Sequence, residues 1–190
     1  MHSNKGKIRI IAGEYRGRRI AVPDRPGLRP TPDRVRETLF NWLGQSLDGL
    51  SCLDLFAGSG ALGFEAASRG AARVVMVEQD RAAFELLKKT REALKATTVN
   101  LVLDDAFAYL RRAGEEFDVV FVDPPFGQNA LPAVFRLLRP RAGMRVYVES
   151  PEPVTAGAHW QERKRARAGQ VSYQLLEWSG DDQGGLPGNV

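Results

Sequence analysis

Residues 54–63 read DLFAGSGALG, and this glycine-containing segment joins an apolar, strand-like run to a helix-like run. Gly58 and Gly60 permit a tight turn and a close approach of the backbone to a ligand. In open α/β sheets, the turn after the first strand lies at the carboxyl ends of the strands, where nucleotides bind. The segment therefore predicts an α/β fold with a nucleotide-like ligand at its first strand–helix connection.

Outward from this segment, strand-like and helix-like runs alternate, which predicts a parallel sheet with helices on both faces. The strand-like runs are 51–56, 72–77, 99–103, 117–122 and 144–149, and the helix-like runs are 60–69, 80–96, 105–113 and 129–139. Only Gly169 and Gln170 then separate the runs 160–168 and 171–178, so we expect a hairpin. The prediction is a seven-stranded, mostly parallel sheet with a C-terminal antiparallel hairpin, the plan of Rossmann-like class I methyltransferases.

The N-terminal segment precedes this alternating pattern. A short β-hairpin is predicted there, with strands at 7–12 and 18–22, and a Pro/Gly-rich loop at 23–30 follows it. Thr31 is predicted to cap a helix, with Pro32 at its first position. The expected divisions are a basic hairpin and loop extension (1–30), a methyltransferase domain (31–179) and a disordered, Gly-rich tail (180–190).

Composition narrows the class of protein further. The chain has 190 residues, of which 43% are apolar and 26% charged, as in one ordinary globular domain. It contains no apolar run long enough for a membrane span, and a single cysteine, Cys52, excludes a disulfide within the chain. Two histidines and one cysteine without ligand spacing predict no metal site. We expect a cytoplasmic monomer that makes no membrane contact.

Positive charge is concentrated near the N-terminus. Residues 1–36 contain ten Lys or Arg and three Asp or Glu, whereas the remainder contains seventeen and twenty. A basic arm of this kind commonly contacts phosphate backbones, although a solvated basic surface gives the same pattern. The charge pattern alone leaves both interpretations open.

Carboxylates end several of the predicted strands and suit a cationic ligand. Asp54 lies four residues before Gly58, where dehydrogenases usually have an apolar residue, and it suits the cationic amino acid end of S-adenosylmethionine. Glu78 could accept both ribose hydroxyls, of that cofactor or of NAD. Asp105 could accept from an adenine amino group beside the Ala106 amide, or it could simply cap the helix at 105–113.

The tetrapeptide Asp123-Pro124-Pro125-Phe126 ends the fourth strand of the alternating pattern. Two consecutive prolines fix the backbone and remove two donors, which leaves a carbonyl acceptor in a rigid position. Asp123 and the Pro124 carbonyl could hold the two hydrogens of an exocyclic amino group, so that its lone pair points at a methyl donor. Asp123 could then take the proton, and Phe126 could stack on an unpaired base.

Together with a specific N-terminal block, these motifs resemble the RsmD family of bacterial 16S ribosomal RNA guanine-N2 methyltransferases. The block comprises RIIAG at 9–13, RGR at 16–18, RPT at 29–31 and RVRETLFN at 34–41, and YVE at 147–149 adds to it. The resemblance runs from about residue 8 to 178. It implies methylation of one guanine amino group in 16S ribosomal RNA, within an assembled or assembling small subunit.

The resemblance also implies that the segment 29–31 lies across the cofactor pocket. The candidate cofactor contacts are then Thr31, Asp54, Phe56, Gly58, Ser59, Gly60, Glu78, Gln79, Asp105, Ala106 and Asp123. The candidate RNA contacts are Arg16, Arg18, Arg19, Arg29 and Arg34, which could hold phosphates. Arg36 is expected to pair with Glu37 within the fold, and the basic run 163–167 is expected to protect an edge strand.

Three alternatives remain beside this interpretation. The same chemistry could act on adenine or cytosine amino groups in DNA or another RNA, although the chain is short for a separate target-recognition domain. An NAD-dependent oxidoreductase could use the same glycine loop, but Asp54 counts against it. A non-catalytic RNA-binding factor would not need an intact Asp123-Pro124-Pro125-Phe126.

Overall fold

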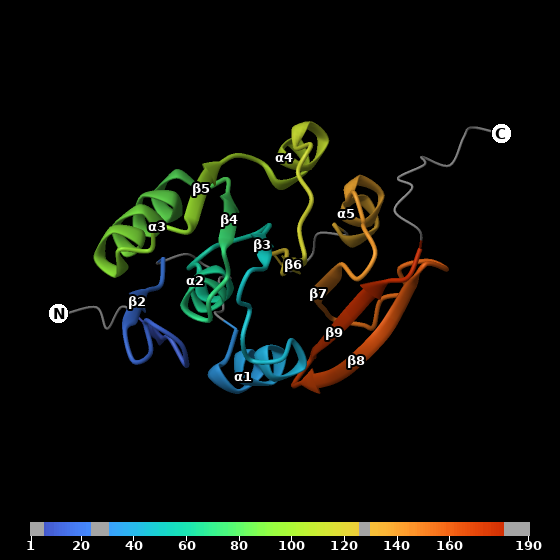
Figure 1. Cartoon of the computed structure of the whole chain (residues 1–190), viewed down its shortest axis with the longest axis horizontal. Helices are drawn as coiled ribbons and strands as arrows, with labels where there is room; N and C mark the ends of the chain where they lie inside the picture. Colours follow the sequence, from blue (N-terminus) through green and yellow to red (C-terminus); the bar gives the residue numbers. More distant parts are fainter. Residues whose placement is uncertain (1–5, 24–30, 126–129, 181–190) are drawn as a thin grey trace.

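The centre of the molecule is a seven-stranded sheet with the order β5-β4-β3-β6-β7-β9-β8 (Figure 1). This computed structural model describes residues 6–23, 31–125 and 130–180. The five parallel strands are β3 (Ser51–Asp54), β4 (Arg73–Glu78), β5 (Val99–Leu103), β6 (Val119–Val122) and β7 (Arg145–Ser150). The antiparallel hairpin consists of β8 (Trp160–Ala168) and β9 (Val171–Trp178). The predicted sheet and its C-terminal hairpin are confirmed.

Helices cover both faces of the sheet, as the alternating pattern predicted. They are α1 (Asp33–Trp42), α2 (Ala61–Ser68), α3 (Arg81–Leu94), α4 (Ala106–Arg112) and α5 (Leu131–Leu137). The first three pack into one hydrophobic cluster and the last two into another, and Figure 1 shows α4 and α5 above the sheet with α1 and α2 below it. All four residues of β6 are therefore buried, because side chains on both of its faces meet a helical layer.

The strand order reverses direction next to β3, since β4 lies on one side of it and β6 on the other. In open α/β sheets this switch point leaves a crevice at the carboxyl ends of the strands. Because β9 runs antiparallel to β7 and starts beside Ser150, the turn between β8 and β9 returns to the same edge. The topology thus brings residues from most of the chain to one end of the sheet.

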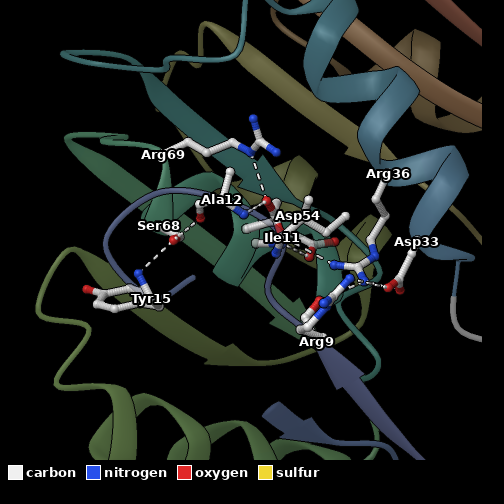
Figure 2. A network of polar contacts seen from close by, with 11 residues as sticks. Arg9, Ile11, Ala12, Tyr15, Asp33, Arg36, Asp54, Ser68 and Arg69 are labelled. Atoms are coloured by element: carbon white, nitrogen blue, oxygen red, sulfur yellow. Dashed lines mark hydrogen bonds and ion pairs between the residues drawn. The ribbon is translucent and has the colours of Figure 1, made fainter. Parts of the chain in front are cut away.

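The N-terminal hairpin consists of β1 (Lys7–Arg9) and β2 (Arg19–Ala21), both shorter than the predicted strands. Its apolar side chains Ile8, Ile10 and Ile20 are buried in the same cluster as α1 and α2. The segment after β1 is held by the carboxylate of Glu65 on α2, which accepts from the amides of Ile11 at 2.8 Å and Ala12 at 3.1 Å (Figure 2). The extension is therefore docked on the main fold.

Buried ion pairs also stabilise the contact between the N-terminal hairpin and the main fold, and one of them differs from the prediction. Arg36 of α1 is fully buried and pairs with Glu65 at 3.3 Å and with Asp33 at 2.7 Å, whereas we expected it to pair with Glu37. The side chain of Glu37 is exposed instead. Arg69 of α2 also contacts Glu65, at 2.8 Å, so that Glu65 is surrounded by four donors.

The start of α1 also differs from the prediction. Pro32 occupies the cap position and no side chain caps the helix, so the expected capping by Thr31 is wrong. The Thr31 hydroxyl instead donates to Glu149 at 3.1 Å, because its side chain faces the end of β7.

Among the residues that the structure describes, no helix is both long and apolar enough to cross a membrane. The predicted tail lies outside the described residues except for Gly180.

Candidate active site

A cavity of about 1160 Å³ opens at the carboxyl ends of the parallel strands. Its walls come from the glycine loop after β3, the ends of β4, β5, β6 and β7, the start of α1 and the β8–β9 turn. Every predicted cofactor contact except Gly60 is among the lining residues. This is the crevice that the strand order predicts, and it has the size of a site for a nucleotide-sized ligand with room for a further group.

The cavity is strongly acidic. Within the described part of its wall there are six carboxylates and no Lys, Arg or His; the six are Asp54, Glu78, Asp104, Asp105, Asp123 and Glu149. Such a field attracts a cation and repels the phosphates of a dinucleotide. The described residues nevertheless contain no group of three or more His, Cys, Asp or Glu placed to hold a metal ion. The charge of the wall therefore favours a cationic ligand.

Carboxylate oxygens accept hydrogen bonds from backbone amides of the glycine loop and of the helix that follows it. The Gly58 amide donates to Glu78 Oε2 at 2.8 Å, and the Gly63 amide, one turn into α2, donates to Asp54 Oδ2 at 2.9 Å. In a dinucleotide site, amides of this loop face a pyrophosphate instead. This arrangement counts against the oxidoreductase alternative, because two anions already fill that position.

Gly60 serves the turn rather than the cavity wall. Its φ is +79°, and a side chain there would meet Phe64, Leu87 and Met76 at less than 3 Å, so the residue faces the core. Gly58 also has a positive φ, of +52°, but lines the cavity. The glycine pattern thus combines one position needed for ligand access with one needed for packing.

Asp54 is almost completely buried at the end of β3. Burial raises its pKa to about 7, with a further contribution from the charge of Glu78, while the hydrogen bond from the Gly63 amide acts in the opposite direction. No cation faces it within the described cavity wall. A positively charged ligand would supply the missing countercharge.

The other predicted cofactor contacts lie along the same wall. Asp105 Oδ1 caps α4 by accepting from the amides of Phe107 at 3.0 Å and Ala108 at 2.9 Å, so the capping alternative is confirmed. This cap uses the second and third amides of α4 and leaves out that of Ala106. Glu78 Oε1 accepts from the Asp80 amide at 2.7 Å, which fixes its carboxylate at the cavity edge. The remaining predicted lining residues are Phe56, Ser59 and Gln79.

Asp123, Pro124 and Pro125 follow β6 and line the cavity, while Phe126 lies outside the described residues. Burial raises the pKa of Asp123 well above its usual value, and the charges of Glu149 and Asp54 raise it further. The nearby hydroxyl of Thr31 acts in the opposite direction. The carboxylate of Asp123 is therefore a stronger base than that of an exposed aspartate, and it needs a cation or hydrogen-bond donors from a ligand to stay charged in this site.

Glu149 ends the Tyr-Val-Glu segment that contributes to the family resemblance, but the sequence analysis assigned it no role in the site. It follows Val148, which pairs with Val122 in the β6–β7 ladder, so Glu149 lies beside Asp123. An acidic residue near the end of each parallel strand is a signal that could have found it. The β8–β9 turn (168–171) and Tyr173 also line the cavity, and only the strand order brings them there.

The described candidate RNA contacts lie on the exterior near the N-terminal hairpin and α1. Arg16, Arg19 and Arg34 are exposed, and so is Arg18, which donates to the Ala93 carbonyl at 2.7 Å and ties the hairpin to α3. Arg29 lies outside the described residues. The basic run 163–167 is on β8 at the edge of the sheet, as predicted, and Arg163 and Arg165 pair with Glu177 and Glu162.

This strand order, the acidic cavity at the switch point and the Asp-Pro-Pro segment after β6 define a Rossmann-like class I methyltransferase. The chain belongs to the family described as Conserved hypothetical protein 95, whose pattern matches residues 8–177. It is 46% identical over 183 residues to Ribosomal RNA small subunit methyltransferase D of Escherichia coli K12, covering 93% of this chain and 92% of that protein.

Two further comparisons agree with this family. The protein of the same name from Haemophilus influenzae is 41% identical and covers 91% of this chain and 95% of its own length. Among solved structures, Escherichia coli yhhF, described as a candidate methyltransferase, superimposes with a TM-score of 0.85 at 42% identity, covering 94% of this chain and all of that one. The resemblance stated from the motifs is therefore confirmed.

Proposed function

We propose that this protein transfers a methyl group from S-adenosylmethionine to the exocyclic N2 amino group of a guanine in the RNA of the small ribosomal subunit. The observation that carries the proposal is the placement of Asp123 and the Pro124 backbone in an acidic cavity beside the glycine loop. The names of the relatives from Escherichia coli and Haemophilus influenzae support ribosomal RNA as the substrate. We further propose that the RNA is bound within an assembled or assembling subunit.

The lining residues fit this cofactor. When bound, S-adenosylmethionine supplies an electrophilic methyl group on a positively charged sulfur, and its amino acid end carries an ammonium group. Asp54 would pair with that ammonium, since it is buried without a cationic partner in the described wall. Glu78 would accept from the ribose hydroxyls. Asp105 and the Ala106 amide would contact the adenine, and S-adenosylhomocysteine would leave as the product.

Asp123 and Pro124 would position the target amino group. The nitrogen of a base amino group is a poor nucleophile because its lone pair is delocalised into the ring. If Asp123 and the Pro124 carbonyl each accept one hydrogen, the lone pair is directed toward the methyl group. Asp123 would accept the proton that the nitrogen loses on gaining the methyl group, and the sulfur would keep the electron pair of its bond to that methyl group.

Substitution of Asp123 by Asn tests this role. The variant keeps the size of the side chain but loses the anionic acceptor, so kcat should fall by about 100-fold or more. The dissociation constant for S-adenosylmethionine, measured by calorimetry, should stay within about threefold of the wild-type value. Unchanged kcat with weakened cofactor binding would instead assign Asp123 to the cofactor and contradict the proposed role.

A further inference from the structure

Glu149 is held in place by two hydroxyl groups. Tyr147, fully buried two residues earlier on β7, donates its phenolic hydroxyl to Glu149 Oε1 at 2.8 Å, and Thr31 donates to the same oxygen at 3.1 Å. Because both donors reach Oε1, the orientation of the carboxylate is fixed. Within the described part of the chain, neither of these contacts uses Oε2, so that oxygen remains for a donor in the cavity.

Two carboxylates thus lie side by side in the cavity, at the ends of the neighbouring strands β6 and β7. Burial raises the pKa of Glu149, while the two hydroxyl hydrogen bonds counteract this effect. In the described wall no cation compensates the pair. Neutral N–H donors from a ligand would stabilise the charged form, since a carboxylate that gains hydrogen bonds recovers part of its lost hydration.

We infer that Glu149 recognises guanine by accepting a hydrogen bond from N1–H while Asp123 accepts from the adjacent N2 amino group; this inference rests on the proposed function. Guanine is the base that presents N1–H directly beside its exocyclic amino group. Two neighbouring acceptors match these two neighbouring donors. Glu149 is then a specificity-determining residue, and Tyr147 and Thr31 are its positioning residues.

The same arrangement disfavours the other amino-bearing bases. Adenine and cytosine carry a ring nitrogen with a lone pair next to the amino group, so each would place an acceptor against the Glu149 carboxylate. A buried acceptor left facing another acceptor loses a hydrogen bond and adds repulsion, and sites built in this way discriminate strongly. Glu149 therefore separates guanine from the adenine and cytosine alternatives that Asp123-Pro124-Pro125 permits.

A test compares base analogues in small subunits whose RNA carries guanine, 6-thioguanine or 2-aminopurine at the target position. All three bases have the N2 amino group, but 2-aminopurine has a lone pair in place of N1–H, and 6-thioguanine keeps N1–H while O6 becomes sulfur. For the wild-type protein we expect kcat/KM to fall by about 100-fold with 2-aminopurine and by less than about fivefold with 6-thioguanine.

The Glu149→Gln variant should change this preference. Its amide can donate to the N1 lone pair of 2-aminopurine, so kcat/KM with guanine should fall by about 100-fold and 2-aminopurine should become the better substrate. Glu152→Gln is the matched control, because Glu152 is an exposed carboxylate in the loop after β7. Its ratio of guanine to 2-aminopurine should equal that of the wild type.

Two results would overturn the inference. One is equal methylation of guanine and 2-aminopurine by the wild-type protein, which needs no variant and applies even if Glu149→Gln does not fold. The other is a Glu149→Gln variant that binds S-adenosylmethionine normally and keeps the wild-type base preference, since Glu149 would then only hold Tyr147 and Thr31. Absence of guanine methylation by the wild type would instead refute the proposed function.

Discussion

Among the proposed cofactor contacts, Asp54 is unusual in its burial and its pKa. Its carboxyl is buried, accepts the Gly63 amide and has a pKa raised to about 7. If Asp54 pairs with the ammonium of S-adenosylmethionine, it must lose its proton before it can do so. Proton release is then linked to cofactor binding at pH values below that pKa.

This linkage predicts the pH dependence of cofactor affinity. From about pH 5.5 to about 7 the association constant should rise with pH, by up to about tenfold per unit, and it should level off above the pKa. Calorimetry in buffers of different ionisation enthalpy would measure both the affinity and the proton released. Asp54→Asn, which keeps an acceptor for Gly63, should give a flat profile. A wild-type profile that is equally flat would remove Asp54 from the cofactor site.

The sequence predicted which residues line the cavity where those residues lie at the end of a parallel strand. Asp54, Glu78 and Asp123 line the cavity as expected, because parallel strands direct their carboxyl ends to one edge. Thr31 was assigned to the right site but to the wrong local contact. Its hydroxyl donates a hydrogen bond to Glu149, 118 residues away, and the helix-capping preference of threonine gives no indication of such a long-range contact.

At the scale of elements, the contact between the N-terminal hairpin and α2 depends on Glu65. This carboxylate is fully buried and accepts from two backbone amides and two arginines, Arg36 and Arg69 (Figure 2). Its removal would leave buried donors without an acceptor. Truncation of one partner in such a buried network is strongly destabilising, by about 3–5 kcal/mol.

Glu65→Ala should therefore lower the free energy of unfolding by about 3–5 kcal/mol, measured by urea denaturation. The matched control is Glu85→Ala on α3, whose exposed pair with Lys88 at 3.2 Å should contribute less than about 1 kcal/mol. Amide exchange at Ile11 and Ala12 should accelerate in the first variant. A decrease below about 1 kcal/mol for Glu65→Ala would mean that the hairpin is held by its apolar contacts alone.

The sequence predicted most strands and helices because their apolar residues recur at the spacing typical of each element. The two strands of the C-terminal hairpin have the predicted bounds, and the predicted alternation of strands and helices is present from β3 to β7. The strand β1 is shorter than expected: the Ile10 amide still donates across the hairpin to the Arg18 carbonyl at 2.9 Å, but the Ile11 amide donates to Glu65 instead of continuing the ladder. The Arg36–Glu65 pair joins residues 29 apart, whereas the sequence suggested only the adjacent Glu37.

At the scale of the whole molecule, charge is divided between an acidic cavity and a basic exterior near the docked hairpin. Arg16, Arg19 and Arg34 are exposed on this part of the described surface. If the target base enters the acidic cavity as proposed, we expect these arginines to hold the phosphates of the flanking RNA. Phosphate contacts of this kind position a substrate without selecting its sequence.

Replacing Arg16, Arg19 and Arg34 together by Gln should weaken binding to small subunits and leave the cofactor dissociation constant unchanged. The slope of log affinity against log salt should become shallower by about one for each arginine that binds a phosphate in the wild-type complex. Replacing Arg163, Arg165 and Arg167 on the edge strand β8 by Gln is the control. If the control weakens subunit binding as much as the N-terminal variant, the RNA surface has been placed on the wrong side.

The shape of the cavity could be predicted only in part. Alternation of strands and helices predicted that the strand ends would meet at one edge, but it carried no information on where the hairpin turn at 168–171 would lie. That position follows from β9 inserting between β7 and β8, which is a property of the strand order. The candidate contacts Phe126 and Arg29 lie outside the described residues and stay predictions.

We propose that this chain methylates guanine N2 in small-subunit RNA, and nucleoside analysis of the methylated product tests this proposal. Small subunits lacking the modification, naked 16S RNA and duplex DNA would each be incubated with labelled S-adenosylmethionine, digested and analysed by mass spectrometry. We predict N2-methylguanosine from the subunits. Label in DNA, or in adenine or cytosine, would contradict the claimed substrate, and absence of label despite cofactor binding would contradict the proposed activity on this RNA.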